Sequence, residues 1–302
     1  MKRNVVAQGP STLMVSLPAK WVKHYGVIKG NQLDLVVEGR KLIFSTDSVD
    51  EGIKSKTIKL LDNYPHYVWT EVIAQFVSGY DEIRIENINL ESMNFIESDM
   101  ITAMMGFDIV KHGSDYVVLQ KVLGEEASQF DTIIRRVFLG LIEQSKVLLN
   151  FFDTGSGIDY ILNFEKTNNR QCNYLKRLLT KEGFVKADKI VFISILIEYL
   201  LSIADNFKYL VWSIQKEDME KFDKKIILHC EDMNEKLELV YKLYFNYSND
   251  LYNEVETSTI RLESREGSVV DDIELNPHVM SNICNIINDL RHITYQIHGI
   301  NS

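Results

Sequence analysis

Basic side chains near the N-terminus are the residues of this sequence best suited to a chemical role. Lys20 and Lys23 are three residues apart, so on a helix they share one face. Arg3 and Arg40 belong to the same short segment. Lysine and arginine bind phosphate oxygens, the contacts that supply most of the affinity of proteins for duplex DNA. Arg3, Lys20, Lys23 and Arg40 are therefore candidates for a DNA-binding surface; the alternative is an ordinary solvated face.

The charge of the chain is distributed unevenly along its 302 residues, whose formal net charge is −10. Residues 1–41 contain seven basic and two acidic residues, a net charge of +5, which leaves −15 for the remainder. A basic segment on an acidic body favours a polyanionic partner at one end only. We therefore expect DNA to contact the N-terminal segment and not the rest of the protein.

Residue patterns typical of enzymes and of zinc sites are missing from the sequence. It contains no GxSxG, HExxH or Walker motif, and its seven histidines are scattered. Its three cysteines, Cys172, Cys230 and Cys284, are far apart and form no CxxC pair. They are typical of reduced core thiols in a cytosolic protein. The sequence therefore predicts a protein with neither enzymatic activity nor cofactor.

The N-terminal segment, residues 1–46, has the pattern of a small β-rich head. We expect strands at 4–8, 13–17, 32–37 and 41–44, and a short helix over 19–25 with Pro18 at its start and Gly26 after its end. A segment of this length buries too little apolar surface to fold alone, since about 40–60 residues is the lower limit without staples. No cysteine or metal cluster is available here. A second copy of the chain is the remaining partner, so we expect a homodimer, with higher assemblies left open.

Residues 55–122 have the pattern of a small α/β domain. Strands are expected at 57–61, 82–86, 107–111 and 116–121, with helices over 66–78 and 90–105. The order βαβαββ predicts a sheet covered by helices on one face. No glycine-rich phosphate loop is present. Both a spacer and a ligand-sensing domain remain open.

From residue 125 to 302 the chain has a helical pattern. We expect helices over 126–152, 158–180, 188–214, 216–253 and 277–298, packed as an antiparallel bundle, with a polar loop over 257–274. The apolar run 190–203 is shorter than the roughly 20 residues that span a bilayer. The N-terminus lacks the apolar stretch of a secretory signal. These features predict a cytoplasmic protein without a membrane insertion. The fold class expected is thus a multidomain α+β protein.

Two stretches of the head carry a specific resemblance. The run from Gly9 to Lys23 and the turn from Gly26 to Leu33 resemble the SpoVT/AbrB-type DNA-binding domain. The shared pattern is a strand, a turn, a second strand ending in Leu-Pro, a short basic helix and a glycine turn into a third strand. The resemblance implies that two chains interlock as swapped hairpins. It also implies that basic residues, here Arg3, Lys20 and Lys23, contact DNA.

The helical part is similar to PhoU, the phosphate-uptake regulator. The similarity lies in 165–170 and 177–179, in Ser202 to Asn206, and in Asn288 to His292. In that family bundle carboxylates can hold metal ions, but here Leu201, Asn288 and His292 stand at acidic positions. The remaining candidates are Glu165, Glu198 and Asp205, too few for a hard cation, which takes about six to eight oxygens. We expect satisfied polar residues without metal; the alternative is a transition metal held with an asparagine and a histidine.

The combined patterns predict a transcription regulator whose head binds duplex DNA as a dimer, while the helical body senses or docks a partner. Sequence preference would depend largely on DNA shape. The alternative is an interaction protein of the PhoU kind. In that case the bundle regulates a phosphate transporter or a signalling kinase, and the head only dimerises the protein. Salt-dependent DNA binding separates the two.

Overall fold

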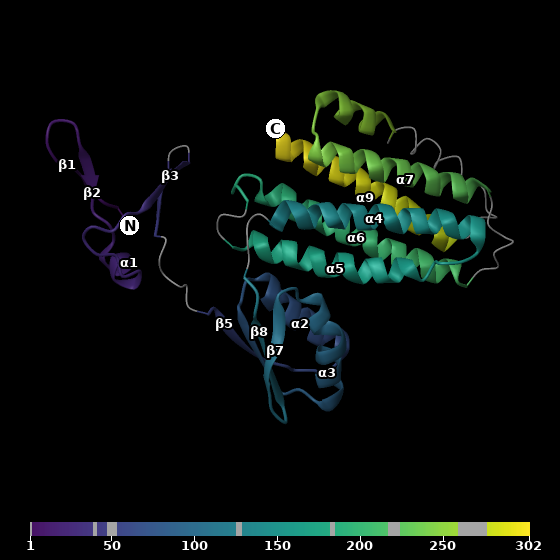
Figure 1. Cartoon of the computed structure of the whole chain (residues 1–302), viewed down its shortest axis with the longest axis horizontal. Coiled ribbons are helices and arrows are strands. Elements are labelled where there is room, and N and C mark those ends of the chain that lie inside the picture. Colours follow the sequence, from purple (N-terminus) through teal and green to yellow (C-terminus); the bar gives the residue numbers. More distant parts are fainter. Residues whose placement is uncertain are drawn as a thin grey trace. The chain divides into compact units, whose positions relative to one another are not determined.

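The fold is mixed α and β, with small sheets in the N-terminal part and a helical C-terminal region (Figure 1). The computed structural model describes residues 2–38, 41–46, 53–124, 129–181, 185–216, 224–258 and 277–302. The chain forms two compact units, one up to Lys54 and the other from Ser55 to Ser302. Arg40, expected to contact DNA, lies outside the described residues.

The first unit contains two separate hairpins and one short helix. β1 (Val5–Ala7) pairs antiparallel with β2 (Leu13–Val15), and β3 (Asp34–Glu38) pairs antiparallel with β4 (Lys41–Ser45). Helix α1 (Ala19–His24) lies between the hairpins in sequence and follows Pro18. The expected strands and helix of the head are therefore confirmed as elements.

The turn after α1 uses the glycine that the sequence places there. Gly26 has a positive φ of 58°, a conformation that favours glycine. It lets the Val27 N–H donate to the Val22 carbonyl at 3.0 Å, which ends the helix as a Schellman turn does. The Asn31 side chain then accepts from the Ile28 N–H at 2.7 Å. Local residues alone thus fix the path from helix to third strand.

The second unit begins with a four-stranded sheet in the order β5-β6-β8-β7. β5 (Ser55–Lys59) and β6 (Glu82–Glu86) are parallel; β8 (Tyr116–Lys121) is antiparallel to both β6 and β7 (Phe107–His112). Helices α2 (Pro65–Val77) and α3 (Leu90–Phe95) lie on one face, as expected (Figure 1). Alternate strand residues, Ile83 and Ile85 among them, are buried beneath these helices.

The second helix of this α/β region is not one continuous α-helix to residue 105, as the sequence predicted. α3 ends at Phe95, and a π-turn (Ile96–Met100) and a 3-10 turn (Ile101–Ala103) follow. In the π-turn the Ile101 N–H donates to the Ile96 carbonyl. Ile96, Met100 and Met104, which follow one another at intervals of four residues, are all buried. This spacing would also suit a regular α-helix, so burial of these side chains does not explain the change of pitch.

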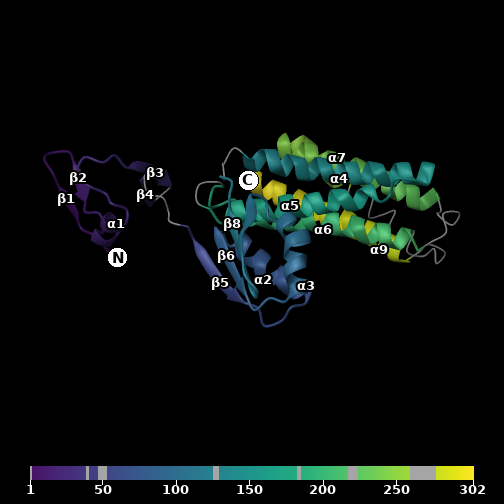
Figure 2. The same cartoon turned by 60° about the horizontal axis from the view of Figure 1, so that its bottom comes forward.

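Five long helices form the rest of the second unit. They are α4 (Gln129–Thr154), α5 (Tyr160–Leu179), α6 (Ile190–Ile214), α7 (Lys224–Phe245) and α9 (Pro277–Asn301). Consecutive helices from α4 to α7 run in alternating directions, and α9 runs antiparallel to α6 (Figures 1 and 2). They pack as a closed ring in the order α4, α5, α6, α9, α7. Most of the loop expected over 257–274 lies outside the described residues.

The helix expected over 216–253 is divided in the structure. α7 ends at Phe245, and a second helix covers residues 249–258. Ser248 precedes this second helix, and its hydroxyl accepts from the Leu251 N–H at 3.1 Å. A serine that accepts three residues ahead is a helix N-cap, so it starts a new helix where continuation was predicted.

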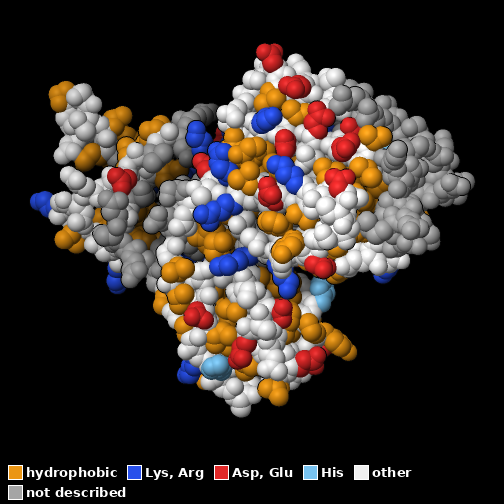
Figure 3. Space-filling view, turned by 45° about the vertical axis from the view of Figure 1, so that its right-hand side comes forward, with side chains coloured by type: hydrophobic (Ala, Val, Ile, Leu, Met, Phe, Trp, Pro, Cys, Tyr) orange, Lys and Arg blue, Asp and Glu red, His pale blue; other side chains and the backbone are white. Residues whose placement is uncertain are grey.

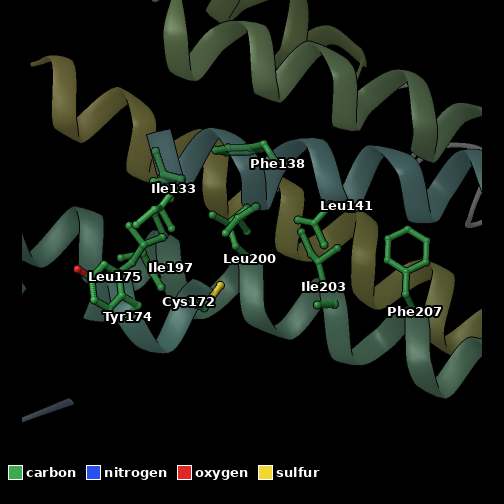
Figure 4. Packing of buried hydrophobic residues seen from close by; sticks show 14 of the residues in the cluster. Ile133, Phe138, Leu141, Cys172, Tyr174, Leu175, Ile197, Leu200, Ile203 and Phe207 are labelled. Atoms are coloured by element: carbon green, nitrogen blue, oxygen red, sulfur yellow. The ribbon is translucent and has the colours of Figure 1, made fainter. Parts of the chain in front are cut away.

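Buried side chains from three helices meet at the centre of the bundle (Figure 4). Figure 4 shows Phe138 of α4, Leu175 of α5 and Leu200 of α6 directed into one cluster. Cys172 also belongs to this core, and burial raises the pKa of its thiol to about 12. The expectation of buried thiols is confirmed for Cys172 and Cys230.

Helix α6 has the extent expected for it, since a helix was predicted over 188–214 and α6 covers Ile190–Ile214. It is the one helix in the described part of the chain whose length and composition would let it cross a membrane. The length of the apolar run 190–203 therefore does not by itself decide against a span. Its inner residues pack in the bundle core, as the central helix of a soluble protein also would, and the structure is compatible with such a protein.

A buried arginine joins the bundle to the α/β sheet. Arg177 of α5 is fully buried; its guanidinium donates to the carbonyls of Phe76 at 2.8 Å and Tyr80 at 2.6 Å, and to Asp81 Oδ1 at 2.6 Å. The guanidinium also lies 4.9 Å from the centroid of the Phe107 ring. Sheet and bundle therefore share one core and one buried polar link.

Candidate functional site

Two lysines of the first unit share one exposed helix face. Pro18 fixes the start of α1 and Gly26 its end, so Lys20 and Lys23 are held three residues apart, and both are exposed. Lys23 lies in the last turn, where a cation suits the helix dipole. Arg3, also exposed, lies two residues before β1. The structure thus places Lys20 and Lys23 together as the sequence predicted.

The apolar side chains of the same unit are also exposed. Val5 is 63% exposed, Leu13 72%, Leu35 52% and Leu42 60%. Of the residues up to Thr46 whose burial is described, none is buried. Hydrophobic side chains accordingly appear on the surface of this unit at the left of Figure 3. An exposed apolar area of this kind is typical of a surface that contacts another molecule.

The carboxylates considered for a metal in the bundle each contact a lysine instead. Lys208 Nζ lies 2.8 Å from Glu165 Oε1 and 2.5 Å from Asp205 Oδ1. Burial lowers the pKa of Lys208, but hydrogen bonds to Asp205 and Glu165 outweigh it, and the pKa is raised overall. Glu198 pairs with Lys176 at 2.8 Å. The lysines therefore provide the positive charge that a cation would bring.

Within the described ranges, no three histidine, cysteine, aspartate or glutamate side chains come together as a set that could hold a metal ion. Asn288 lines a hollow between α6 and α9. His292 instead stacks on Tyr199, with ring centroids 4.8 Å apart. Of the two, only the histidine is engaged elsewhere, because Asn288 lines the same hollow as Glu198 and Asp205.

The hollow between α6 and α9, which we call the α6–α9 hollow, has a volume of about 480 Å³ and is lined mainly by polar residues. Glu198 and Asp205 both line it, as expected for residues seven apart on one helix. Opposite them, Asp289 of α9 accepts a long hydrogen bond of 3.4 Å from Asn206. Burial raises the pKa of Asp289, although a hydrogen bond from Ser202 and the proximity of His292 oppose it. Such a surface suits polar or cationic groups.

Two charged side chains of the candidate sites, Lys208 and Asp289, were missed by the sequence reasoning. Lys208 follows Asp205 by three residues on a helix, and this spacing alone was a sufficient signal for an ion pair. Asp289 gave no such signal, because only the packing of α9 on α6 brings it near Asn206.

No protein-family model matches the chain, and comparison with curated proteins and with solved structures found no match.

Proposed function

We propose that this protein is a DNA-binding transcription regulator, in which the first unit pairs with a second copy of itself and binds duplex DNA. The observation that carries the proposal is the combination of uncovered apolar strands and an exposed basic helix in one unit of opposite charge to the body. Apolar surface drives pairing, and lysines attract phosphates.

Pairing is the first step of the proposal. A hairpin whose Val5 and Leu13 side chains face water cannot be stable by itself, since an isolated two-stranded hairpin is marginal. Covering these strands with the same strands of a second chain removes them from water. The swapped-hairpin arrangement of the SpoVT/AbrB family, which the sequence resembles, would do this.

Phosphate binding is the second step. A dimer carries two copies of Lys20, Lys23 and Arg3, and two of Arg40. The chain outside residues 1–41 is acidic, with a net charge of −15, so it repels DNA and leaves the head as the contact surface.

The test compares full-length protein with the variant Lys20→Ala, Lys23→Ala across a range of salt concentrations. Removing one lysine–phosphate interaction lowers the salt slope by about one unit, so in a dimer the slope should fall by up to about four units. We expect duplex affinity to fall by more than about tenfold at physiological salt, equally on different sequences.

A matched control is Lys166→Ala with Lys186→Ala, which removes the same charge from exposed positions of the second unit. It should bind like the parent. If the head variant also binds as tightly as the parent, with the same slope, the DNA-binding proposal is wrong.

The alternative function, docking of a transporter or kinase by the bundle, is favoured by a different observation. Apolar side chains point outward from α6 and α9, among them Val191 (63% exposed), Trp212 and Tyr295. Unchanged DNA binding in the head variant would support this alternative, with the head serving for dimerisation only. The resemblance to PhoU makes phosphate signalling the first pathway to examine.

A further inference from the structure

A second hollow, which we call the junction hollow, lies where the α/β region meets the bundle. Its volume is about 480 Å³, within the roughly 300–1,000 Å³ of small-molecule sites. Trp69 of α2 and Phe95 of α3 form one wall, and residues of α5 and α6 form the opposite side. All of these elements belong to the second unit, so its shape is set within one compact body.

One amide side chain in the junction hollow has unused hydrogen-bonding capacity. Asn173 is 5% exposed, lines the hollow, and its side chain has no hydrogen-bond partner in the part of the protein that the structure covers. Asn169, one helical turn earlier, donates to Glu165 Oε1 at 2.7 Å, and its Oδ1 is closed off from the hollow. A largely buried amide without a protein partner is favourably paired with a ligand, so Asn173 is the group that a ligand would meet.

The amide of Asn173 defines what a ligand edge must offer. It provides both a donor and an acceptor, so it requires an acceptor and a donor side by side on the ligand. A ring with an amino group beside an acceptor nitrogen, the edge that asparagine recognises in adenine, matches this demand.

The aromatic wall and the net charge of the junction hollow restrict further which ligands can bind there. Trp69 and Phe95 have ring centroids 6.5 Å apart and are tilted by 53° to each other, so a planar base stacks on one of the two rings. Lys208 is paired with both Glu165 and Asp205, so these three groups together carry one negative charge. An uncharged ligand is therefore preferred to an anion.

We propose that the junction hollow binds an uncharged nucleoside whose base carries an exocyclic amino group, with adenosine as the type. Asn173 reads the edge of the base, and Trp69 stacks on its plane. This inference does not rest on DNA binding, because it concerns residues of the second unit only and is measured without DNA.

The test uses the full chain with Trp21→Phe and Trp212→Phe, which leaves Trp69 as the sole tryptophan. Fluorescence is excited at a wavelength that nucleosides do not absorb, and calorimetry on the parent gives the affinity. Adenosine should quench Trp69 saturably. Inosine, which lacks the amino group, and adenosine monophosphate, which adds negative charge, should each bind at least about tenfold more weakly.

The variant Asn173→Leu keeps the side-chain size and removes the amide. It should weaken adenosine binding by at least about tenfold while leaving the thermal unfolding temperature equal or higher, because an unpaired buried amide is removed. The control Asn150→Leu, at an exposed position of α4, should bind adenosine like the parent.

Three results would overturn the proposal: no adenosine binding at millimolar concentration, equal binding of inosine, or tighter binding of adenosine monophosphate. The first two use the parent protein and so hold even if a variant does not fold. Loss of adenosine binding has no bearing on DNA affinity, so the two proposals fail independently.

Discussion

At the scale of single residues, Arg177 is the side chain whose environment is most demanding. It is fully buried, and its partners are two carbonyl groups and a carboxylate from the α/β region. Lys121 and Lys181 also reach Asp81, at 3.2 and 3.3 Å. The link between sheet and bundle is therefore a charged cluster around one aspartate.

Replacing Arg177 by methionine should cost about 3–5 kcal/mol of unfolding free energy. The change leaves the carbonyls of Phe76 and Tyr80 buried without their donor, and breaking a buried ion pair has a penalty of this size. Urea denaturation measures it. Arg170→Met, at an exposed position of the same helix, should stay within about 0.5 kcal/mol of the parent. Similar values for the two variants would mean that Arg177 is not the link.

Asp81 makes this link sensitive to acid. Burial raises the pKa of Asp81, but the hydrogen bond from Lys121 and the charges of Lys181, Lys121 and Arg177 together hold it below the ordinary 3.8. A carboxyl whose pKa is lowered on folding stabilises the protein above 3.8 and loses this effect as the pH falls through its folded value. The stability gap between parent and Asp81→Asn should thus be largest at neutral pH and shrink below 3.8. Urea denaturation at several pH values checks it; a gap independent of pH would contradict it.

At the scale of elements, local sequence signals fix some helix ends and not others. Pro18 and Gly26 bound α1 by their own conformational preferences. In the segment after α3, by contrast, a π-turn and a 3-10 turn interrupt a helix that the sequence pattern predicted to continue. Helix ends are therefore readable from the sequence where a residue has a strong local preference.

The break between α7 and the helix at 249–258 gives a prediction at this scale. Ser248→Ala removes the side-chain acceptor for the Leu251 N–H and should lower the unfolding free energy by about 1 kcal/mol. Ser248→Asp, another good cap, should retain the parent value. Thermal unfolding compares them. If the alanine variant is as stable as the parent, the Ser248 cap does not stabilise the start of the second helix.

At the scale of the whole molecule, the two units differ in how they bury their apolar surface. Residues 55–302 share one continuous core. The first unit has exposed valines and leucines on both hairpins and no described residue that is buried. In a single copy of the chain, the apolar side chains of the first unit therefore stay exposed to water.

We expect the full-length protein to be at least a dimer at micromolar concentration, as measured by light scattering. Leu13→Asp with Leu35→Asp should shift it toward monomer, since charges would then enter the paired surface. The control Leu61→Asp, at a position 88% exposed in the second unit, should stay a dimer. A monomeric parent would refute pairing through the head, and a dimer unaffected by the double change would place the interface elsewhere.

The sequence alone determined the order and kind of most elements. Strands and turns of the head, the βαβαββ order of residues 55–122 and the start of α9 at Pro277 follow from alternation, glycine and proline, which act over a few neighbouring residues. The exposed basic pair Lys20 and Lys23 followed from the same local rules. These features need no knowledge of distant contacts.

Only the tertiary structure decided which side chains meet. The contact of Lys208 with Glu165, the burial of Arg177 against Asp81 and the two hollows all join residues 43 or more positions apart. The ion pair of Lys208 with Asp205 is local, but its effect on a metal site depends on Glu165 from another helix. Such encounters depend on how helices pack, and helical periodicity fixes the face of a helix but not the helix that it contacts.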